Sequence, residues 1–180
     1  MDKIDSFSVL PEAEYEMAKM LYRTGKSLDC KMTCKTRALK NQPKGWRIIF
    51  NKRETNSTLF WMQITDGALY VKANLFHIQN YSDKMSGCAK KIKDAIKATK
   101  ECESCGLCPP RSPYRIDDGI YNPCVFHGHY FTKLENDEWR MLSELIALEH
   151  DNQFMSEDAP PAISPDRQKQ DKPYHGFHKN

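Results

Sequence analysis

The fold is decided by residues 58–76, which read TLFWMQITDGALYVKANLF. Two apolar runs, 58–64 and 68–76, lie on either side of Asp66 and Gly67. An Asp-Gly pair between apolar runs is a strong hairpin signal, because both central positions of the tight turn need a positive φ. Every other residue of the second run is apolar, which predicts a strand with one buried face. The residues expected to face the core are Leu69, Val71, Ala73 and Leu75.

A further strand and three helices are predicted around this hairpin. The short apolar run WRIIF at 46–50 is followed by turn-forming residues at 54–57, so the hairpin extends to a meander from Gly45 to Phe76. Apolar residues at helical spacing predict helices over 11–24, 82–101 and about 137–149. The predicted fold class is therefore α+β, an antiparallel sheet with two or three helices and a cysteine-rich hairpin.

The ends of the predicted helices carry capping signals. Pro11 suits the first turn of the first helix, and Gly25 is expected to cap its C-terminus. Asn136 is expected to be the N-cap of the last helix. The polar, lysine-rich segment 26–44 between the first helix and the meander is expected to be a loop.

Length, composition and charge exclude several classes of protein. The chain has 180 residues, with 27 Lys and Arg against 24 Asp and Glu, so a strongly basic nucleic-acid coat protein is not expected. No apolar run approaches the roughly 20 residues of a membrane-spanning helix, and residues 1–16 do not resemble a secretory signal. We expect one domain over 1–150, a disordered tail over 151–180, and a cytoplasmic location.

Cysteines cluster between residues 102 and 129, in the pattern Cys-x-x-Cys-Gly-x-Cys followed by Cys-x-x-His. A Cys-x-x-Cys pair lets two thiolates reach one metal ion, and a second hairpin signal at 117–119 would return the later Cys and His to the first pair. The tetrahedral zinc set predicted from this spacing is Cys102, Cys105, Cys124 and His127. Such a zinc would stabilise the fold, because no residue pattern of a catalytic zinc site accompanies it.

Three alternatives to this zinc set remain open at the level of sequence. Cys108 is an additional thiolate that could replace His127 in a four-cysteine site. The run from Cys102 to Pro109 also resembles part of a bacterial ferredoxin motif, so an iron–sulfur cluster using Cys124 is a further interpretation. The cysteines could equally be reduced thiols without a metal.

Aromatic and lysine side chains suggest binding surfaces. Consecutive residues of a strand face opposite sides of the sheet, so one of Phe60 and Trp61 must lie on the second face, where it could line a ligand site. The lysine-rich face of the helix at 82–101 could instead bind phosphate or nucleic acid, or be a solvated surface. The candidate ligand-binding residues are Trp46, Phe60, Trp61 and Tyr70.

Cys30 and Cys34 are four residues apart and are surrounded by basic residues. On a helix they would share one face, and the neighbouring cations would lower the pKa of their thiols. The alternative interpretation is two ordinary cysteines in a polar connection.

The order of elements over 45–101, opening with Gly45-Trp46 at the first strand of the meander, resembles an uncharacterised bacterial domain family with a G-W motif. That family is distantly similar, at the level of the fold, to GyrI-like ligand-binding domains. The resemblance implies an α+β sheet with a concave face for a small, partly apolar molecule, and it does not imply catalysis. The cysteine-rich segment departs from the family pattern.

These observations lead to one functional expectation and two alternatives. We expect a non-enzymatic protein with a structural zinc site and a sheet face that binds a small ligand. The first alternative is a nucleic-acid or protein interaction module that uses the zinc knuckle and the lysines of 84–100. The second is a thiol or iron–sulfur redox protein.

Overall fold

The structure, a computed structural model, describes residues 3–37, 45–101, 113–124 and 127–152. Its helical elements are η1 (Lys3–Phe7), α1 (Glu12–Ser27), η2 (Ile78–Tyr81), α2 (Ser82–Ser86), α3 (Lys90–Lys97) and α4 (Asn136–Asp151). Its strands are β1 (Lys31–Arg37), β2 (Gly45–Asn51), β3 (Thr58–Thr65), β4 (Ala68–Ala73), β5 (Tyr114–Ile116), β6 (Gly119–Tyr121) and β7 (His129–Thr132). The predicted α+β fold class is confirmed.

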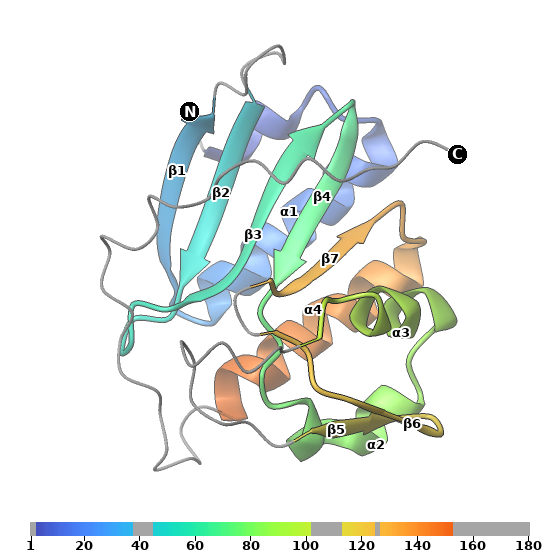
Figure 1. The fold of residues 1–180 in the computed structure, drawn as a ribbon. Coiled ribbons are helices and arrows are strands. Elements are labelled where there is room, and N and C mark those ends of the chain that lie inside the picture. Colours follow the sequence, from blue (N-terminus) through green and yellow to red (C-terminus); the bar gives the residue numbers. More distant parts are fainter. Residues whose placement is uncertain (1–2, 38–44, 102–112, 125–126, 153–180) are drawn as a thin grey trace.

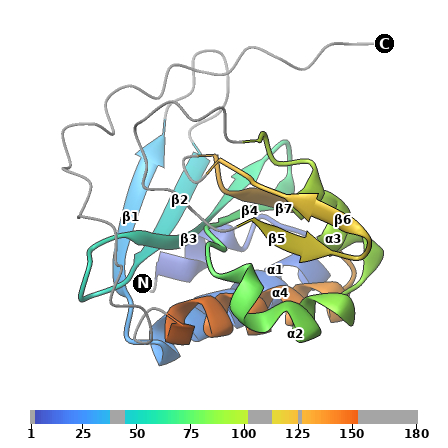
Figure 2. The same cartoon turned by 60° about the horizontal axis from the view of Figure 1, so that its bottom comes forward.

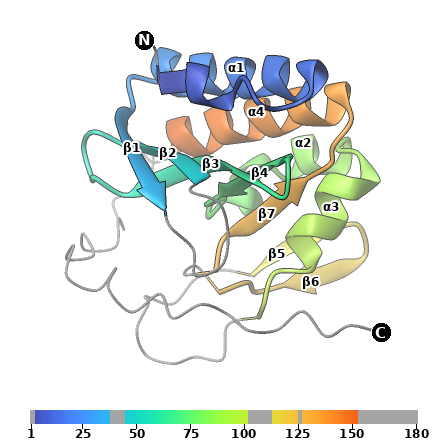
Figure 3. The same ribbon diagram turned by 90° about the horizontal axis from the view of Figure 1, so that it is seen from above.

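Five strands form one antiparallel sheet in the order β1-β2-β3-β4-β7. Figure 1 shows the sheet in front of α1 and α4, and Figure 3 shows both helices on the same side of it. The sheet is therefore one layer and the two long helices are the other. The helices leave the opposite face of the sheet uncovered by any helix or strand that the structure describes.

The core lies between the sheet and the two long helices. Phe50 of β2 stacks on Phe60 of β3, with ring centroids 4.5 Å apart and an interplanar angle of 12°. Phe131 of β7 and Trp139 of α4 are almost completely buried in the same cluster. Alternate strand residues thus bury large apolar side chains against the helices, which is the main source of stabilisation in such a layer.

The hairpin predicted at residues 58–76 is present. Asp66 and Gly67 have φ angles of 51° and 73°, so both turn positions have the positive φ that the sequence signal requires. Leu69, Val71 and Ala73 are completely buried, and the predicted core face of this strand is confirmed.

A strand, β1, replaces the loop predicted within 26–44. Met32 and Cys34 share strand parity with the residues of β2 that face the helices, and both pack against the core. Thr33 and Lys35 alternate with them on the other face. The prediction was wrong because this strand has only two apolar positions, and its pairing with β2 is a tertiary feature that the local sequence does not indicate.

The helix boundaries also differ from those predicted. Gly25 is not a cap, because α1 continues to Ser27. The helix predicted over 82–101 is two shorter helices, α2 and α3, separated at 87–89. The N-cap of α4 is Glu135 rather than Asn136, and it forms a capping box with Glu138.

The second predicted hairpin is present as β5 and β6, with Asp117 at a φ of 51° in its turn. Figure 2 shows this hairpin near α3, beyond the β7 edge of the large sheet. Lys93 and Lys97 of α3 both donate hydrogen bonds to the Asp117 carboxylate, at 2.8 and 2.7 Å. These bonds lower the pKa of Asp117 and tie the hairpin turn to α3.

Among the helices of the described residues, none combines the length and apolar character needed to cross a membrane.

Candidate ligand-binding face and cysteine segment

The uncovered face of the sheet contains a row of four side chains that are neighbours in register. Ile49 of β2, Trp61 of β3, Lys72 of β4 and Tyr130 of β7 lie opposite one another across the four strands. Trp61 and Tyr130 form an edge-to-face pair with ring centroids 6.0 Å apart. The Lys72 ammonium lies 5.5 Å from the centroid of the Tyr130 ring. Aromatic rings and a cation thus extend across this face from the central strand β3 to the edge strand β7, with Trp61 and Lys72 partly exposed and Tyr130 exposed.

Arg47 of β2 completes this arrangement. Its guanidinium carbon lies 4.0 Å from the centroid of the Trp61 ring. Its Nε and Nη2 atoms both donate to Oε1 of Gln63, at 2.9 and 2.6 Å. Gln63 therefore holds the guanidinium in a fixed orientation over the indole, which reduces the side-chain entropy lost when an anion binds to it.

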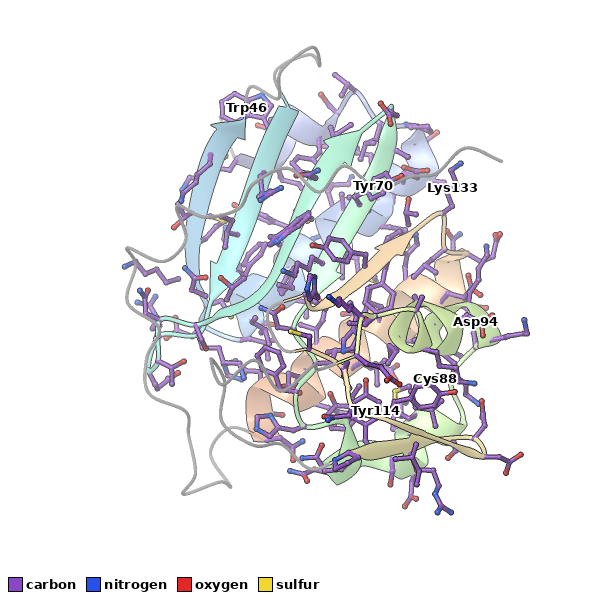
Figure 4. All side chains as sticks on the ribbon, viewed as in Figure 1. Trp46, Tyr70, Cys88, Asp94, Tyr114 and Lys133 are labelled. Carbon is purple, nitrogen blue, oxygen red and sulfur yellow. The ribbon has the colours of Figure 1, made fainter. Side chains whose placement is uncertain are left out.

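The four predicted ligand-binding residues are divided between the two faces of the sheet. Trp61 and Tyr70 lie on the uncovered face, and Figure 4 shows Tyr70 on β4. Phe60 is completely buried in the core, so it is not available to a ligand. Trp46 has the strand parity of the helix-facing residues and is 42% exposed. Figure 4 shows it near one end of the sheet.

Sequence reasoning missed Arg47, Lys72, Gln63 and Tyr130 as members of this face. The alternation of side chains along each strand would have found Lys72 beside Tyr70. The position of Tyr130 could not be inferred, because β7 is distant in sequence and its pairing with β4 had not been predicted.

Charge is distributed unequally between the two layers. The five strands of the large sheet together contain three lysines, two arginines and no Asp or Glu. Lys31, Lys35, Arg47 and Lys72 all have the strand parity of the uncovered face. In the helical layer, α4 contains five acidic residues and a single arginine. The small net charge of +3 therefore conceals a basic sheet face opposite an acidic helix.

The lysines of α2 and α3 are paired with carboxylates. Because these carboxylates already interact with the ammonium groups, the surface of α2 and α3 is a weaker candidate for binding phosphate than the sheet face. The pairs are Lys84 with Glu144, Lys90 with Asp94, Lys91 with Glu135 and Glu138, and Lys93 and Lys97 with Asp117.

Of the predicted metal ligands, Cys124 and His127 belong to the described residues, whereas Cys102, Cys105 and Cys108 lie outside them. Within the described part of the chain, no group of three or more His, Cys, Asp or Glu residues could hold a metal ion. The zinc and iron–sulfur sites predicted from the cysteine spacing therefore remain predictions.

The backbone nevertheless brings residues 100–101 beside Cys124. Glu101 forms an antiparallel bridge with Pro123, and the N–H of Cys124 donates to the carbonyl of Lys100 at 2.8 Å. The N–H of His127 donates to the carbonyl of Cys124 at 3.1 Å, so the backbones of the two predicted ligands are in direct contact. The residue immediately before Cys102 is thus held next to the second half of the predicted site.

Cys30 and Cys34 do not share a helix face, because Cys34 lies on strand β1 and Cys30 precedes it. Burial raises the pKa of the Cys30 thiol to about 11, and burial likewise raises the pKa of Cys34. The prediction of thiols activated by nearby lysines was wrong, because removal from water outweighs the attraction of the cations.

A buried carboxylate, Glu149 of α4, lies among the apolar residues of this helix. Its Oε2 atom accepts hydrogen bonds from the N–H groups of Phe76 and His77 and from the Tyr81 hydroxyl, each at 2.9 Å. Its Oε1 atom lies 2.8 Å from Nδ1 of His77 and 3.9 Å from Nζ of buried Lys52. These partners come from distant parts of the sequence, so no local pattern could have indicated the cluster.

His129, at the start of β7, is a second buried polar residue. Its Nε2 atom lies 3.3 Å from the carbonyl of Leu75, and since a carbonyl can only accept, Nε2 carries the proton. Nδ1 then accepts from the Thr99 hydroxyl at 2.7 Å. Burial lowers the pKa of His129 to about 4. The imidazole is therefore neutral near pH 7 and joins β7 to the segment after β4.

Comparisons of the chain with protein-family models, curated proteins and solved structures find no match. No relative supplies a function, and the resemblance of 45–101 to the G-W family stays a prediction.

Proposed function

We propose that this protein binds an anionic compound with a planar aromatic ring system on the uncovered face of its sheet. The observation that carries the proposal is the cluster of Arg47, Trp61, Lys72 and Tyr130, in which two cations lie beside two aromatic rings. Trp61 and Tyr130 supply surfaces for stacking, and the cations supply charge for a phosphate or carboxylate. A ligand-binding sheet face is also what a relationship to the G-W, distantly GyrI-like family implies.

A mononucleotide such as AMP is a suitable probe, because it combines a planar ring with a phosphate. Titration calorimetry with the full chain is expected to show binding of AMP, and Trp61→Leu is expected to weaken it about tenfold through loss of stacking. The matched control is Trp46→Leu, which also replaces a tryptophan by leucine, but at a position with the strand parity of the helix-facing residues. Failure of AMP and inorganic phosphate to bind at millimolar concentration would contradict the proposal.

A second variant tests the charged part of the site. Arg47→Gln is expected to lower the affinity for AMP and for inorganic phosphate alike, since both depend on the cation. Arg140→Gln removes the same charge from the exposed surface of α4 and is expected to have no effect. Equal effects of the two variants would show that the sheet face is not the binding surface.

A structural zinc site is a second candidate function, and it concerns a different part of the molecule. The bridge from Glu101 to Pro123 supports it, because it holds the start of the cysteine cluster beside Cys124 and His127. The proposed ligands are Cys102, Cys105, Cys124 and His127, with Cys108 as the alternative thiolate. Thiolate ligands need reducing surroundings, which suits the proposed cytoplasmic location.

Metal content and visible absorption of protein purified without chelator, under anaerobic conditions, test this candidate. About one zinc per chain without colour is expected, and removal by chelator should lower the melting temperature. Cys124→Ser is expected to abolish zinc retention, whereas the control Cys34→Ser, on β1, is expected to retain it. Iron with acid-labile sulfide would favour the redox alternative, and absence of any metal would refute both metal sites.

A further inference from the structure

We infer that the occupant of the uncovered sheet face is a single-stranded nucleic acid rather than a free mononucleotide. The inference rests on the proposed function, because it uses the same aromatic and cationic side chains. The charged surface is more extensive than one nucleotide needs, and this indicates a ligand with several phosphates.

The basic surface extends beyond the aromatic cluster. Lys31 and Lys35 of β1 are exposed on the uncovered face, and neither has an ion-pair partner among the described residues. Lys35 pairs in register with Arg47 of β2, so the positive charge continues from one strand to the next. One phosphate needs Arg47 and Lys72 at most. Lys31 and Lys35 are two strands away from Trp61, and cations at that distance suit a ligand that carries several phosphates.

The size of the face agrees with a ligand of several nucleotides. Four strand spacings separate β1 from β7, and with about 4.8 Å for each spacing the sheet is about 19 Å wide. Aromatic side chains lie on three neighbouring strands of this face: Trp61 on β3 and Tyr70 on β4 are partly exposed, and Tyr130 on β7 is exposed. A mononucleotide could contact only part of this surface.

Aromatic side chains can stack only on bases whose flat faces are accessible. In a duplex these faces are covered by neighbouring base pairs, whereas in a single strand they can lie on protein rings. Tyr130, which is 51% exposed, offers such a surface. The combination of exposed rings with a row of cations therefore favours a single strand over a duplex.

The side chains also suggest how a strand lies on the sheet. The exposed lysines of β1 and Arg47 of β2 form a cationic strip along one side, and the rings occupy β3, β4 and β7. No Asp or Glu of the five strands repels a phosphate chain. Phosphates along β1 and β2 would place the bases over the aromatic strands.

Binding of a labelled eight-nucleotide oligothymidylate to the full chain, measured over a series of salt concentrations and compared with dTMP, tests the inference. The oligonucleotide is expected to bind at least tenfold more tightly than dTMP. The double variant Lys31→Gln, Lys35→Gln should reduce the slope of log affinity against log salt by about 1.4, as expected for two lost phosphate contacts. The same variant should leave dTMP binding unchanged.

Control variants separate this result from general effects. Trp61→Leu is expected to weaken binding of both the oligonucleotide and dTMP. The double variant Lys19→Gln, Lys26→Gln removes two charges from α1, on the helical layer, and is expected to leave the slope unchanged.

Three outcomes would overturn the inference. If the oligonucleotide binds no more tightly than dTMP, the inference fails while the proposed function stands. If a duplex of the same length binds as tightly as the single strand, base stacking is not the basis of recognition and the inference also fails. If neither dTMP, AMP nor the oligonucleotide binds, the proposed function and the inference fail together.

Discussion

At the scale of the residue, His129 couples the stability of the fold to pH. The imidazole is enclosed between Thr99 and the carbonyl of Leu75, and burial lowers its pKa to about 4. Unfolding exposes the ring and returns its pKa to about 6.5. The unfolded chain therefore binds a proton in the range between these two values, in which the folded chain does not.

Because the unfolded chain binds this additional proton, a lower pH favours unfolding. The neutral His129 contributes its stability fully above pH 6.5, and this contribution is lost as the pH falls from about 6.5 towards 4. The largest loss corresponds to about 3 kcal/mol. Urea denaturation of the wild type should show this decrease, and His129→Gln should show a shallower pH dependence over the same range. An unchanged dependence in the variant would mean that other groups cause the loss.

Residue patterns predicted part of the site and could not have predicted the rest. Alternation along one strand correctly placed Phe60 and Trp61 on opposite faces. Which of them faced solvent depended on the position of the helices, which is a tertiary property. Glu149 shows the stronger limit, because its partners are Lys52 and groups of the segment 76–81, and no pattern along α4 indicates them.

At the scale of the element, the packing of α1 on β2 depends on a glycine. A Cβ atom added to Gly25 would lie between 2.3 and 2.8 Å from atoms of the Phe50 ring. Phe50 is itself stacked on Phe60 in the buried layer, so its ring has little room to move. Gly25 thus permits close approach of the helix to the sheet.

Gly25→Ala is therefore expected to destabilise the protein by about 1–3 kcal/mol, although alanine favours helices elsewhere. Gly87→Ala is the matched control, since the nearest atom to its added Cβ is the carbonyl oxygen of Lys84 at 3.6 Å. Thermal unfolding of the two variants should show a lower melting temperature for the first and almost no change for the second. Equal melting temperatures would show that the Phe50 ring can give way.

Elements with a local sequence signal were predicted correctly, and elements without one were missed. The β3–β4 and β5–β6 hairpins were found because each turn region contains an Asp-Gly pair, Asp66-Gly67 in the first and Asp118-Gly119 in the second. Strand β1 was missed because its polar sequence has no turn signal and only pairing with β2 makes it a strand. The break between α2 and α3 was missed because the apolar stripe continues across it, with Cys88 still buried.

At the scale of the whole molecule, composition was a poor guide to the distribution of charge. A net charge of +3 argued only against a strongly basic nucleic-acid coat protein, because it describes the chain as a single body. The sheet topology shows that basic residues share one face while α4 carries acidic ones on the other layer. Charge of this kind can turn the sheet towards a polyanion before contact and raise the association rate.

The bridge between Glu101 and Pro123 has a consequence for the entropy of the chain. Residues 102–112 lie between this bridge and β5, whose first residue Tyr114 pairs with Tyr121. Closing a free chain of about 11 residues costs about 2 kcal/mol in its length-dependent part alone. Because the bridge and the hairpin form when the protein folds, this entropy is lost on folding and not when a metal ion binds. A metal ion held by this segment would therefore bind more tightly than it would to the same cysteines in an isolated peptide.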